Sequence, residues 1–245
     1  MENNIAGLEC LYAPELHENS TDLLLKGDEA RHLKVLRKRE GEHVALTNGK
    51  GIFAEAGLLK TGRDTAELQV LKTFKNYGEP VLKIGLALGI LENKDRFEFA
   101  LEKCTELGIA EFFPLKSDFV QRKQISIERL QTKAIAAMKQ CKRSILPQIH
   151  EPKSVVELLK NADYDVLIFA DMEGESFKNV FKKFLKEENP FKSALIIAGP
   201  EGGFSTKEIE ILRNDKRCVR LLLGERRLRA ETAAIVSVGL VSVGF

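Results

Sequence analysis

Five short apolar runs, separated by longer amphipathic stretches, are the feature of the sequence that most constrains its fold. They lie beyond Val81, at residues 84–88, 112–115, 166–170, 194–198 and 219–223. Short continuous apolar runs are typical of strands that are buried on both faces of a sheet. The alternation therefore predicts an α/β domain with a largely parallel sheet, whose ligand site lies beyond the carboxyl ends of the strands.

Two of the intervening stretches carry apolar residues at spacings of three and four, as on one face of a helix. The first stripe consists of Phe97, Leu101, Cys104 and the adjoining Leu107, and the second of Ile127, Leu130, Ala134, Ala137, Met138 and Cys141. The segment after Glu231 is apolar nearly all round and rich in β-branched residues. Its periodicity fits a helix and a strand equally, and either form must be buried against the sheet or a second subunit.

The N-terminal part has a different rhythm. Alternating runs at 43–47 and 52–56 flank Asn48-Gly49-Lys50-Gly51, and residues 65–71 form a further alternating run. Asn-Gly between two extended runs predicts a β-hairpin, because both central positions of such a turn favour positive φ. We expect a small, β-rich, barrel-like domain here, followed by a linker at 76–80, where glycine and proline interrupt the pattern.

The composition is that of an ordinary globular protein, with 44% hydrophobic and 30% charged residues. No apolar run is long enough to cross a bilayer, and the start lacks the basic segment and apolar core of a secretion signal, so we expect a cytoplasmic protein. The four cysteines, Cys10, Cys104, Cys141 and Cys218, contain no CxxC pair. The sequence therefore suggests neither a metal site nor a disulfide framework.

The net charge of +2 conceals three basic clusters. The first consists of Arg31, Lys34, Arg37, Lys38 and Arg39. Residues 116–143 hold eight Lys or Arg against two acids, and residues 216–229 hold six against one. A single cluster of this kind is more often a solvated face, but three together favour a surface for a phosphate backbone.

A glycine-rich turn, Gly199-Pro200-Glu201-Gly202-Gly203-Phe204, follows the apolar run at 194–198. It precedes Ser205-Thr206-Lys207-Glu208, which has the spacing of a helical capping box. Glycine lets the backbone approach a ligand with no Cβ in the way, although the same turn also fits a tight strand-to-helix connection. The spacing is not GxGxxG, which disfavours a dinucleotide site.

A second glycine-containing loop, LGERRLRAETA at 223–233, follows the next apolar run. Two such loops after adjacent strands form one cleft, with Arg226, Arg227 and Arg229 at its rim. The planar guanidinium donates to paired oxygens, so these arginines suit phosphate or charge on a base. A basic surface loop around a buried Leu228 is the alternative.

GPEGGFSTKE followed by LGERRLRAETA resembles the paired signature of the ribosomal RNA small subunit methyltransferase E family, which methylates N3 of a uridine in 16S rRNA and belongs to the SPOUT class. Residues 31–37 resemble the family's N-terminal RNA-contact segment, 102–108 its central helix, and 140–143 its glutamine-cysteine-glycine-arginine element. The resemblance implies a PUA-like RNA-binding β-barrel at 1–75 and a SPOUT methyltransferase domain with a deep trefoil knot at 76–245. It also implies a homodimer, S-adenosylmethionine as cofactor, and 16S rRNA within the 30S subunit as substrate.

The resemblance also implies which residues form the site, and it implies no bound metal. Those for S-adenosylmethionine are Ala198, Gly199, Pro200, Glu201, Gly202, Gly203, Leu223, Gly224, Leu228, Ala230, Thr232 and Ala233. Those for RNA are Arg31, His32, Lys34, Arg37, Arg122 and Arg143. Three positions depart from the family's pattern, since Arg227 stands where an aliphatic residue is common, Ala230 where threonine is, and Lys142 where glycine is. These departures bear on substrate contacts rather than on the cofactor loops.

Methylation at N3 requires a free Watson-Crick edge and the loss of the N3 proton. Arg229 and Arg226 are candidates for stabilising the uracil anion, and Glu201 for accepting the proton or contacting the cofactor. The simpler alternatives are that Glu201 caps the next helix and that Arg226 only binds phosphate. His32 is expected to contact RNA or to pack rather than to catalyse. Two other functions stay open: a non-catalytic RNA-binding protein with this fold, and a SPOUT enzyme that acts on another RNA, such as tRNA ribose.

Overall fold

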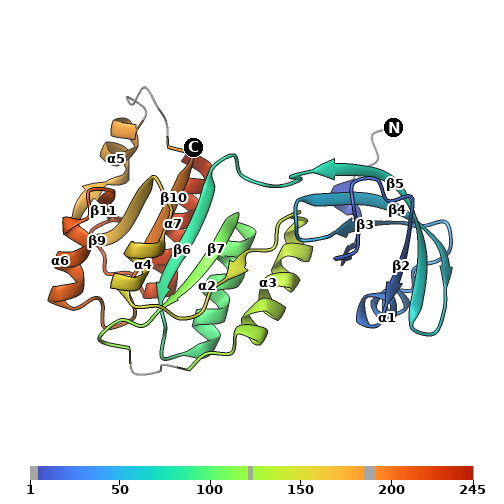
Figure 1. The fold of residues 1–245 in the computed structure, drawn as a ribbon, viewed down its shortest axis with the longest axis horizontal. Coiled ribbons are helices and arrows are strands. Elements are labelled where there is room, and N and C mark those ends of the chain that lie inside the picture. Colours follow the sequence, from blue (N-terminus) through green and yellow to red (C-terminus); the bar gives the residue numbers. More distant parts are fainter. Residues whose placement is uncertain (1–4, 121–123, 185–190, 245) are drawn as a thin grey trace. The chain divides into compact units, whose positions relative to one another are not determined.

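The computed structural model describes residues 5–120, 124–184 and 191–244. These residues form two compact units, and most of their helices and strands are labelled in Figure 1. The first contains residues up to Glu79 together with Ile135–Leu146, and the second contains Pro80–Ala134 and the residues from Pro147 onward. The domain boundary between residues 75 and 76 stays a prediction, and the compact units place 76–79 and 135–146 with the N-terminal part.

The first unit is built on a five-stranded sheet with the order β1-β3-β4-β5-β2. The strands are β1 (Cys10–Tyr12), β2 (Asp22–Lys26), β3 (His43–Thr47), β4 (Ile52–Thr61) and β5 (Thr65–Lys75), and a short 3-10 helix, Ile5–Gly7, precedes them. β1 pairs parallel with β3, and the other pairs are antiparallel. The helix α1 (Asp28–Val35) packs against β2 and β5, so that Ala30 and Leu33 join the buried core of the sheet.

The predicted hairpin is confirmed, because β3 pairs with β4 in the register Thr47 to Phe53. Its turn differs from the expected geometry. Gly49 and Gly51 have positive φ angles of 69° and 97°, but Asn48 does not. Instead, Asn48 Oδ1 accepts hydrogen bonds from the N–H groups of Lys50 at 2.7 Å and Ile52 at 3.0 Å. The asparagine thus shapes the turn through its side chain rather than through a left-handed backbone.

The second unit contains a six-stranded sheet with the order β11-β9-β10-β6-β7-β8, in which every pair is parallel. The strands are β6 (Lys83–Gly89), β7 (Ile109–Leu115), β8 (Gln148–Ile149), β9 (Val166–Ser176), β10 (Ser193–Ala198) and β11 (Cys218–Leu222). The five apolar runs lie in five of these strands, apart from Leu223, which follows β11. The predicted parallel sheet is therefore confirmed.

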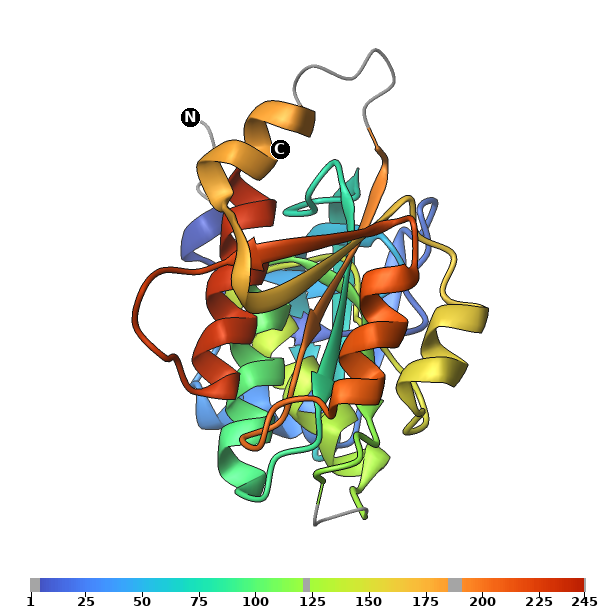
Figure 2. The ribbon, with the colours of Figure 1, turned by 90° about the vertical axis from the view of Figure 1, so that its left-hand side faces the viewer.

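Helices cover both faces of this sheet. They are α2 (Lys94–Glu106), α4 (Val155–Asn161), α5 (Phe177–Phe184), α6 (Thr206–Asn214) and α7 (Ala230–Gly244), while α3 (Ile127–Cys141) contributes residues to both units. Figure 2 shows α2 and α7 on one face of the sheet and α4 and α6 on the other. In the predicted stripes of α2 and α3, the buried members are Phe97, Leu101, Cys104, Leu130, Ala134, Ala137 and Met138.

The C-terminal segment, which the sequence left undecided, is the helix α7. It packs against α2, β6 and β10, and this tertiary burial outweighs the strand preference of its β-branched residues. The trefoil knot that the family resemblance implies stays a prediction. Within the described ranges, no helix has the length and apolar character needed to cross a membrane.

Candidate active site

The glycine turn begins where β10 ends at Ala198, and it is seated tightly on β6. Gly203 has a φ of 75°, and its N–H donates to the carbonyl oxygen of Pro200 at 2.9 Å, which closes the turn. A Cβ built on Gly89, the last residue of β6, would lie 2.3 Å from the nitrogen of Pro200. Position 89 therefore needs glycine, because any side chain there would displace the turn.

The predicted capping box at the start of α6 is confirmed. Ser205 Oγ accepts from the N–H of Glu208 at 3.3 Å, and Glu208 Oε2 accepts from the N–H of Ser205 at 2.8 Å. The buried Glu208 carboxylate also accepts from the Ser117 hydroxyl at 2.9 Å and from the N–H of Asp118 at 3.2 Å. These bonds tie the residues that follow the turn to the loop after β7.

Glu201 does not cap α6, because Ser205 is the N-cap and forms the capping box with Glu208. The exposed Glu201 carboxylate instead accepts from the backbone N–H of Glu92, at 3.2 Å and 3.4 Å for its two oxygens. Glu92 lies in the loop between β6 and α2. Glu201 therefore joins the glycine turn to the carboxyl end of the neighbouring strand.

The second loop, residues 223–229, connects β11 to α7. Gly224 has a φ of 129°, in the left-handed region that favours glycine. Arg226, Arg227 and Arg229 are exposed, and within the described part of the chain their guanidinium groups have no hydrogen-bond or ion-pair partner. The carbonyl oxygen of Arg229 accepts from the N–H of Ala233 at 2.8 Å, so α7 begins directly after these arginines.

Two of the six basic side chains in the cluster at 216–229 form ion pairs with acidic residues. Arg217 pairs with Asp215 at 2.8 Å, and Arg220 pairs with Asp171 at 2.8 Å. Both carboxylates lie outside residues 216–229, the range over which the charges were compared in the sequence. The unpaired positive charge of this cluster is therefore concentrated in the second loop.

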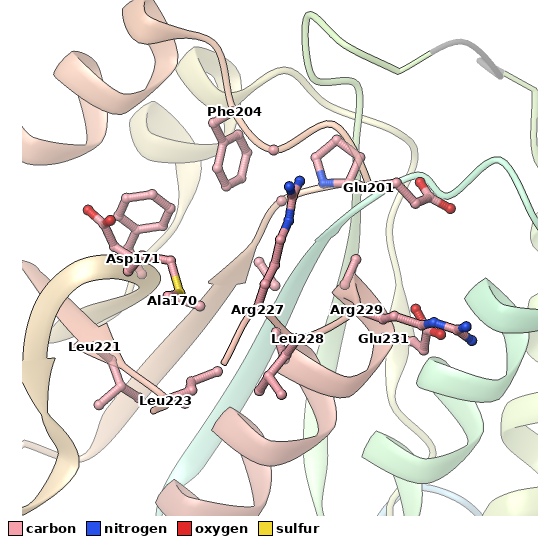
Figure 3. Close-up of a pocket in the computed structure, with 18 of the residues that line it drawn as sticks. Ala170, Asp171, Glu201, Phe204, Leu221, Leu223, Arg227, Leu228, Arg229 and Glu231 are labelled. Carbon is pink, nitrogen blue, oxygen red and sulfur yellow. The ribbon is translucent and has the colours of Figure 1, made fainter. Parts of the chain in front are cut away.

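The two loops and the middle of β9 enclose a cavity of about 520 Å³ (Figure 3). Small-molecule sites typically occupy about 300–1,000 Å³. β9 contributes residues 169–172 from a bulge, where its pairing with β11 jumps from Phe169 to Glu175. Figure 3 shows Glu201 and Phe204 on one side of the cavity and Leu228 and Arg229 on the other, with the side chain of Arg227 extending toward Phe204.

Ten of the twelve residues predicted to contact a cofactor line this cavity, and they are Ala198, Gly199, Pro200, Glu201, Gly203, Leu223, Gly224, Leu228, Ala230 and Ala233. Gly202 and Thr232 do not line it, and Gly202 faces Phe119 in a neighbouring hollow. The predicted catalytic residues Arg226, Arg229 and Glu201 all line the cavity. Their roles in binding and catalysis stay predictions.

Further lining residues were not predicted as cofactor contacts or catalysts, and they are Arg96, Phe169, Ala170, Asp171, Met172, Phe204, Ile209, Leu221, Arg227 and Glu231. Two of them follow from the rule that carboxyl ends of adjacent parallel strands meet at one edge. Asp171 comes directly after the apolar run at 166–170, and Arg96 comes soon after β6. The same rule that identified the glycine turn therefore finds both.

Charges of both signs line the cavity. Burial raises the pKa of Asp171, but hydrogen bonds from the Glu173 N–H at 3.0 Å and from Arg220 at 2.8 Å outweigh it, and the pKa is lowered. Asp171 is therefore ionised at neutral pH. Glu231, in the first turn of α7, is buried, and its Oε2 has no hydrogen-bond partner among the residues described. In the same part of the chain, no group of three or more His, Cys, Asp or Glu is placed to hold a metal ion.

The predicted RNA contacts of the first unit lie on α1 and directly after it. Arg31, Lys34 and Arg37 are exposed, and His32 is half-buried. Arg31 pairs with two acids, Asp28 and Asp64, and Lys34 Nζ donates to the carbonyl oxygen of Arg63 at 2.6 Å. Arg122 lies outside the described residues.

The prediction for Arg143 needs correction, because its side chain is buried rather than at the surface. The residue is 2% exposed, and its guanidinium donates to Glu79 Oε2 at 3.0 Å through Nε and 2.5 Å through Nη2. Glu79 Oε1 accepts from the N–H groups of Ser144 at 2.9 Å and Ile145 at 2.8 Å. This buried pair fixes residues 143–145 to the end of the linker, so the guanidinium is engaged within the protein instead of facing phosphate.

Two family models match the chain in the order of its two units. The RNA methyltransferase PUA domain matches residues 25–71, and the RNA methyltransferase domain matches residues 78–242. The second match covers most of the chain.

Curated relatives and solved structures agree with these models. The ribosomal RNA small subunit methyltransferase E of Rickettsia conorii is 28% identical over 92% of this chain and 91% of its own length. The enzyme of the same name from Buchnera aphidicola of Acyrthosiphon pisum is 30% identical over 89% of this chain and 87% of its own length. The crystal structure of the Neisseria gonorrhoeae enzyme of the same name, bound to S-adenosylmethionine, has a TM-score of 0.84 and 26% identity, and covers 96% of this chain and 97% of that one. A methyltransferase from Legionella pneumophila with the same bound cofactor has a TM-score of 0.81, 26% identity and the same coverage. The chain described here belongs to the RNA methyltransferase family of ribosomal RNA small subunit methyltransferase E.

Proposed function

We propose that this chain transfers a methyl group from S-adenosylmethionine to N3 of a uridine in 16S rRNA. One observation carries the proposal: two glycine loops, which follow β10 and β11 on either side of β9, enclose a cavity of about 520 Å³ lined by ten of twelve expected cofactor contacts. Relatives that share the family are named as small-subunit rRNA methyltransferases, and the Neisseria gonorrhoeae relative was crystallised with S-adenosylmethionine.

The cavity suits S-adenosylmethionine in size and in the distribution of its groups. Leu221, Leu223 and Phe204 supply apolar walls for an adenine, and the glycine turn lets backbone groups approach its edge. Glu231 Oε2, a buried acceptor without a partner among the described residues, suits a cofactor that carries a positive charge. When bound, the cofactor supplies the sulfonium methyl group that is transferred.

The reaction also requires that the uridine loses its N3 proton. The target base must be flipped out or single-stranded, because N3 lies on the Watson-Crick edge. Arg229 and Arg226 line the cavity, their guanidinium groups have no partner among the described residues, and we assign to them the stabilisation of the uracil anion. Glu201 is the proposed proton acceptor, since its carboxylate is exposed at the cavity wall and the Glu92 N–H holds it in place.

RNA binding is assigned to the N-terminal domain, residues 1–75, and methyl transfer to residues 76–245. The match of the PUA model and the exposed cations of α1 support this division. Arg37 follows α1 in a left-handed conformation with a φ of 55°, and no described residue pairs with its guanidinium. Exposed cations of this kind bind a phosphate backbone favourably because their binding releases counterions condensed on the nucleic acid, so this segment is the proposed backbone contact.

We further propose a homodimer that acts in the cytoplasm on 16S rRNA within the 30S subunit. The neighbouring helices α2 and α7 carry exposed apolar side chains, with Phe99 47% and Val243 86% exposed. Association of two chains through this face would remove these side chains from water. Analytical ultracentrifugation that finds only monomers at micromolar concentration would contradict the dimer.

Two experiments separate the proposal from its rivals. Calorimetry with S-adenosylmethionine tests the cofactor, and absence of binding at millimolar ligand would favour a non-catalytic RNA-binding protein. Transfer of tritiated methyl to free 16S rRNA, 30S subunits and tRNA tests the substrate. We expect label in 16S rRNA, and label only in tRNA would instead identify an enzyme for another RNA.

A further inference from the structure

One carboxylate of the cavity lacks the partner that its burial demands. Glu231 is 8% exposed, and Oε1 lies 3.7 Å from Nε of Arg96, beyond hydrogen-bond distance. Its second oxygen, Oε2, is buried and has no hydrogen-bond partner among the described residues. Arg96 comes from α2 and Glu231 from the first turn of α7, so two adjacent helices bring this pair to the cavity.

Arg96 and Glu231 form an ion pair in which Glu231 Oε2 has no hydrogen bond from any described residue. A buried carboxylate with an unused oxygen destabilises the folded protein, because the solvation it loses is not replaced. The N-terminus of α7 stabilises its negative charge, and Arg96 Nε lies within ion-pair distance, but neither supplies the missing hydrogen bond. A bound group with a positive charge and N–H donors would supply both.

The position of the pair in the cavity identifies that group. Figure 3 shows Leu221, Leu223, Ala170 and Phe204 away from Glu231, which lies beside Arg229 at the opposite end. The first end is mostly apolar, although it also holds the Asp171 carboxylate, and it suits an adenine, so Glu231 faces the remainder of the cofactor. The α-amino acid of S-adenosylmethionine carries an ammonium and a carboxylate on one carbon, and Glu231 beside Arg96 presents the opposite charges side by side.

We propose that Arg96 and Glu231 form the subsite for the α-amino-acid end of the cofactor. Glu231 Oε2 accepts from the ammonium group, and the Arg96 guanidinium donates to the carboxylate, a pairing that Arg makes with particular geometric fit. This inference rests on the proposed function, since it concerns S-adenosylmethionine in the same cavity.

The test is calorimetry of Glu231→Gln with three ligands. S-adenosylmethionine has both the amino-acid end and the sulfonium, S-adenosylhomocysteine has only the former, and 5′-methylthioadenosine has neither. The variant is expected to bind the first two about 10- to 100-fold more weakly, the loss typical of one charge-assisted hydrogen bond, and 5′-methylthioadenosine with unchanged affinity. Arg96→Gln, whose side chain is 41% exposed in the wild type, is expected to give the same pattern with little risk to folding. The control Glu210→Gln removes an exposed acid of α6 that does not line the cavity, and is expected to change none of the three affinities.

The thermal midpoint of the ligand-free variant provides an independent readout. Because Glu231→Gln removes a buried charge that is only partly compensated, the midpoint is expected to stay level or rise. Equal losses of affinity for all three ligands would overturn the proposed subsite. A loss of affinity for S-adenosylmethionine alone would also overturn it, because it would place Glu231 at the sulfonium. Unchanged binding with loss of methyl transfer would also overturn it and make Glu231 a catalytic group. If the wild type binds none of the three ligands, the proposed function itself fails.

Discussion

Gly89 ends β6 directly against the glycine turn, which makes its substitution a sharp probe of the cofactor cavity. A Cβ at this position would lie 2.3 Å from the nitrogen and 2.4 Å from Cδ of Pro200, and 2.9 Å from the carbonyl carbon of Gly199. Because these neighbours are backbone and a proline ring, no flexible side chain can move aside. Gly89→Ala therefore requires the turn to move by about 1 Å to restore ordinary van der Waals contact of about 3.5 Å.

The expected effects follow from this displacement. Overpacking of this kind costs about 1–3 kcal/mol, and in a chain of this size each kcal/mol lowers the thermal midpoint by about 2–4 °C. Since a displacement of about 1 Å in a binding or catalytic element can cost on the order of 100-fold, we expect the affinity for S-adenosylmethionine to fall at least about tenfold. Differential scanning fluorimetry measures the first effect and calorimetry the second.

The matched control is Gly239→Ala on α7, where a Cβ would meet only Leu107 Cδ1 at 3.8 Å. This substitution is expected to stabilise the helix by up to about 1 kcal/mol and to leave the affinity unchanged. If Gly89→Ala kept the wild-type midpoint and affinity, the tight seating of the turn on β6 would be refuted.

Three further predictions concern single groups. Glu79→Gln removes the charge that pairs with the buried Arg143, and is expected to cost about 3–5 kcal/mol in urea unfolding; a loss below about 1 kcal/mol would contradict the buried clamp. Arg229→Ala is expected to slow single-turnover methyl transfer about 100-fold, and an unchanged rate would remove Arg229 from the mechanism. The hydrogen bonds from Arg217 lower the pKa of Asp215 in the folded protein below its ordinary value of 3.8. The ionised Asp215 therefore stabilises the folded protein above pH 3.8, and this stability is lost as the pH falls through the lowered pKa of the folded state. Asp215→Asn is therefore expected to lower stability at pH 7 by up to about 1 kcal/mol, with the difference disappearing in strong acid; a difference that grows on acidification would contradict this assignment.

The parallel sheet and the hairpin were predictable because their signals are local. Short apolar runs mark buried strands wherever the chain places them, and Asn48-Gly49 marks a turn between two extended runs. The geometry of that turn was not predictable in the same way, since it depends on Asn48 Oδ1 bonding to its own turn. The form of the last segment was undecidable locally, because only contacts with α2 and β6 make α7 a helix.

The residues of the site could be predicted where they belong to a local sequence motif. Contacts between residues that are distant in the sequence could not be predicted. The two glycine loops could be paired because the carboxyl ends of parallel strands lie at one edge of the sheet, but the strands before them were wrongly predicted to be adjacent, since β9 lies between β10 and β11. Glu231 was part of a recognised motif, but its unpaired oxygen depends on burial, which no sequence pattern gives. Arg143 was predicted as an RNA contact, and its burial could not be foreseen because its partner, Glu79, lies 64 residues earlier and nothing local signals the pair.

The central claim, methylation of uracil N3 in 16S rRNA, is tested most directly by nucleoside analysis of the product. The protein is incubated with 30S subunits that lack the modification and with S-adenosylmethionine, and the 16S rRNA is then digested and analysed by mass spectrometry. The account predicts one 3-methyluridine per 16S rRNA, formed about 100-fold more slowly in a reaction with Arg229→Ala. A methyl group on ribose or on another base would contradict this prediction. Methylated tRNA together with unmodified 16S rRNA would contradict it as well.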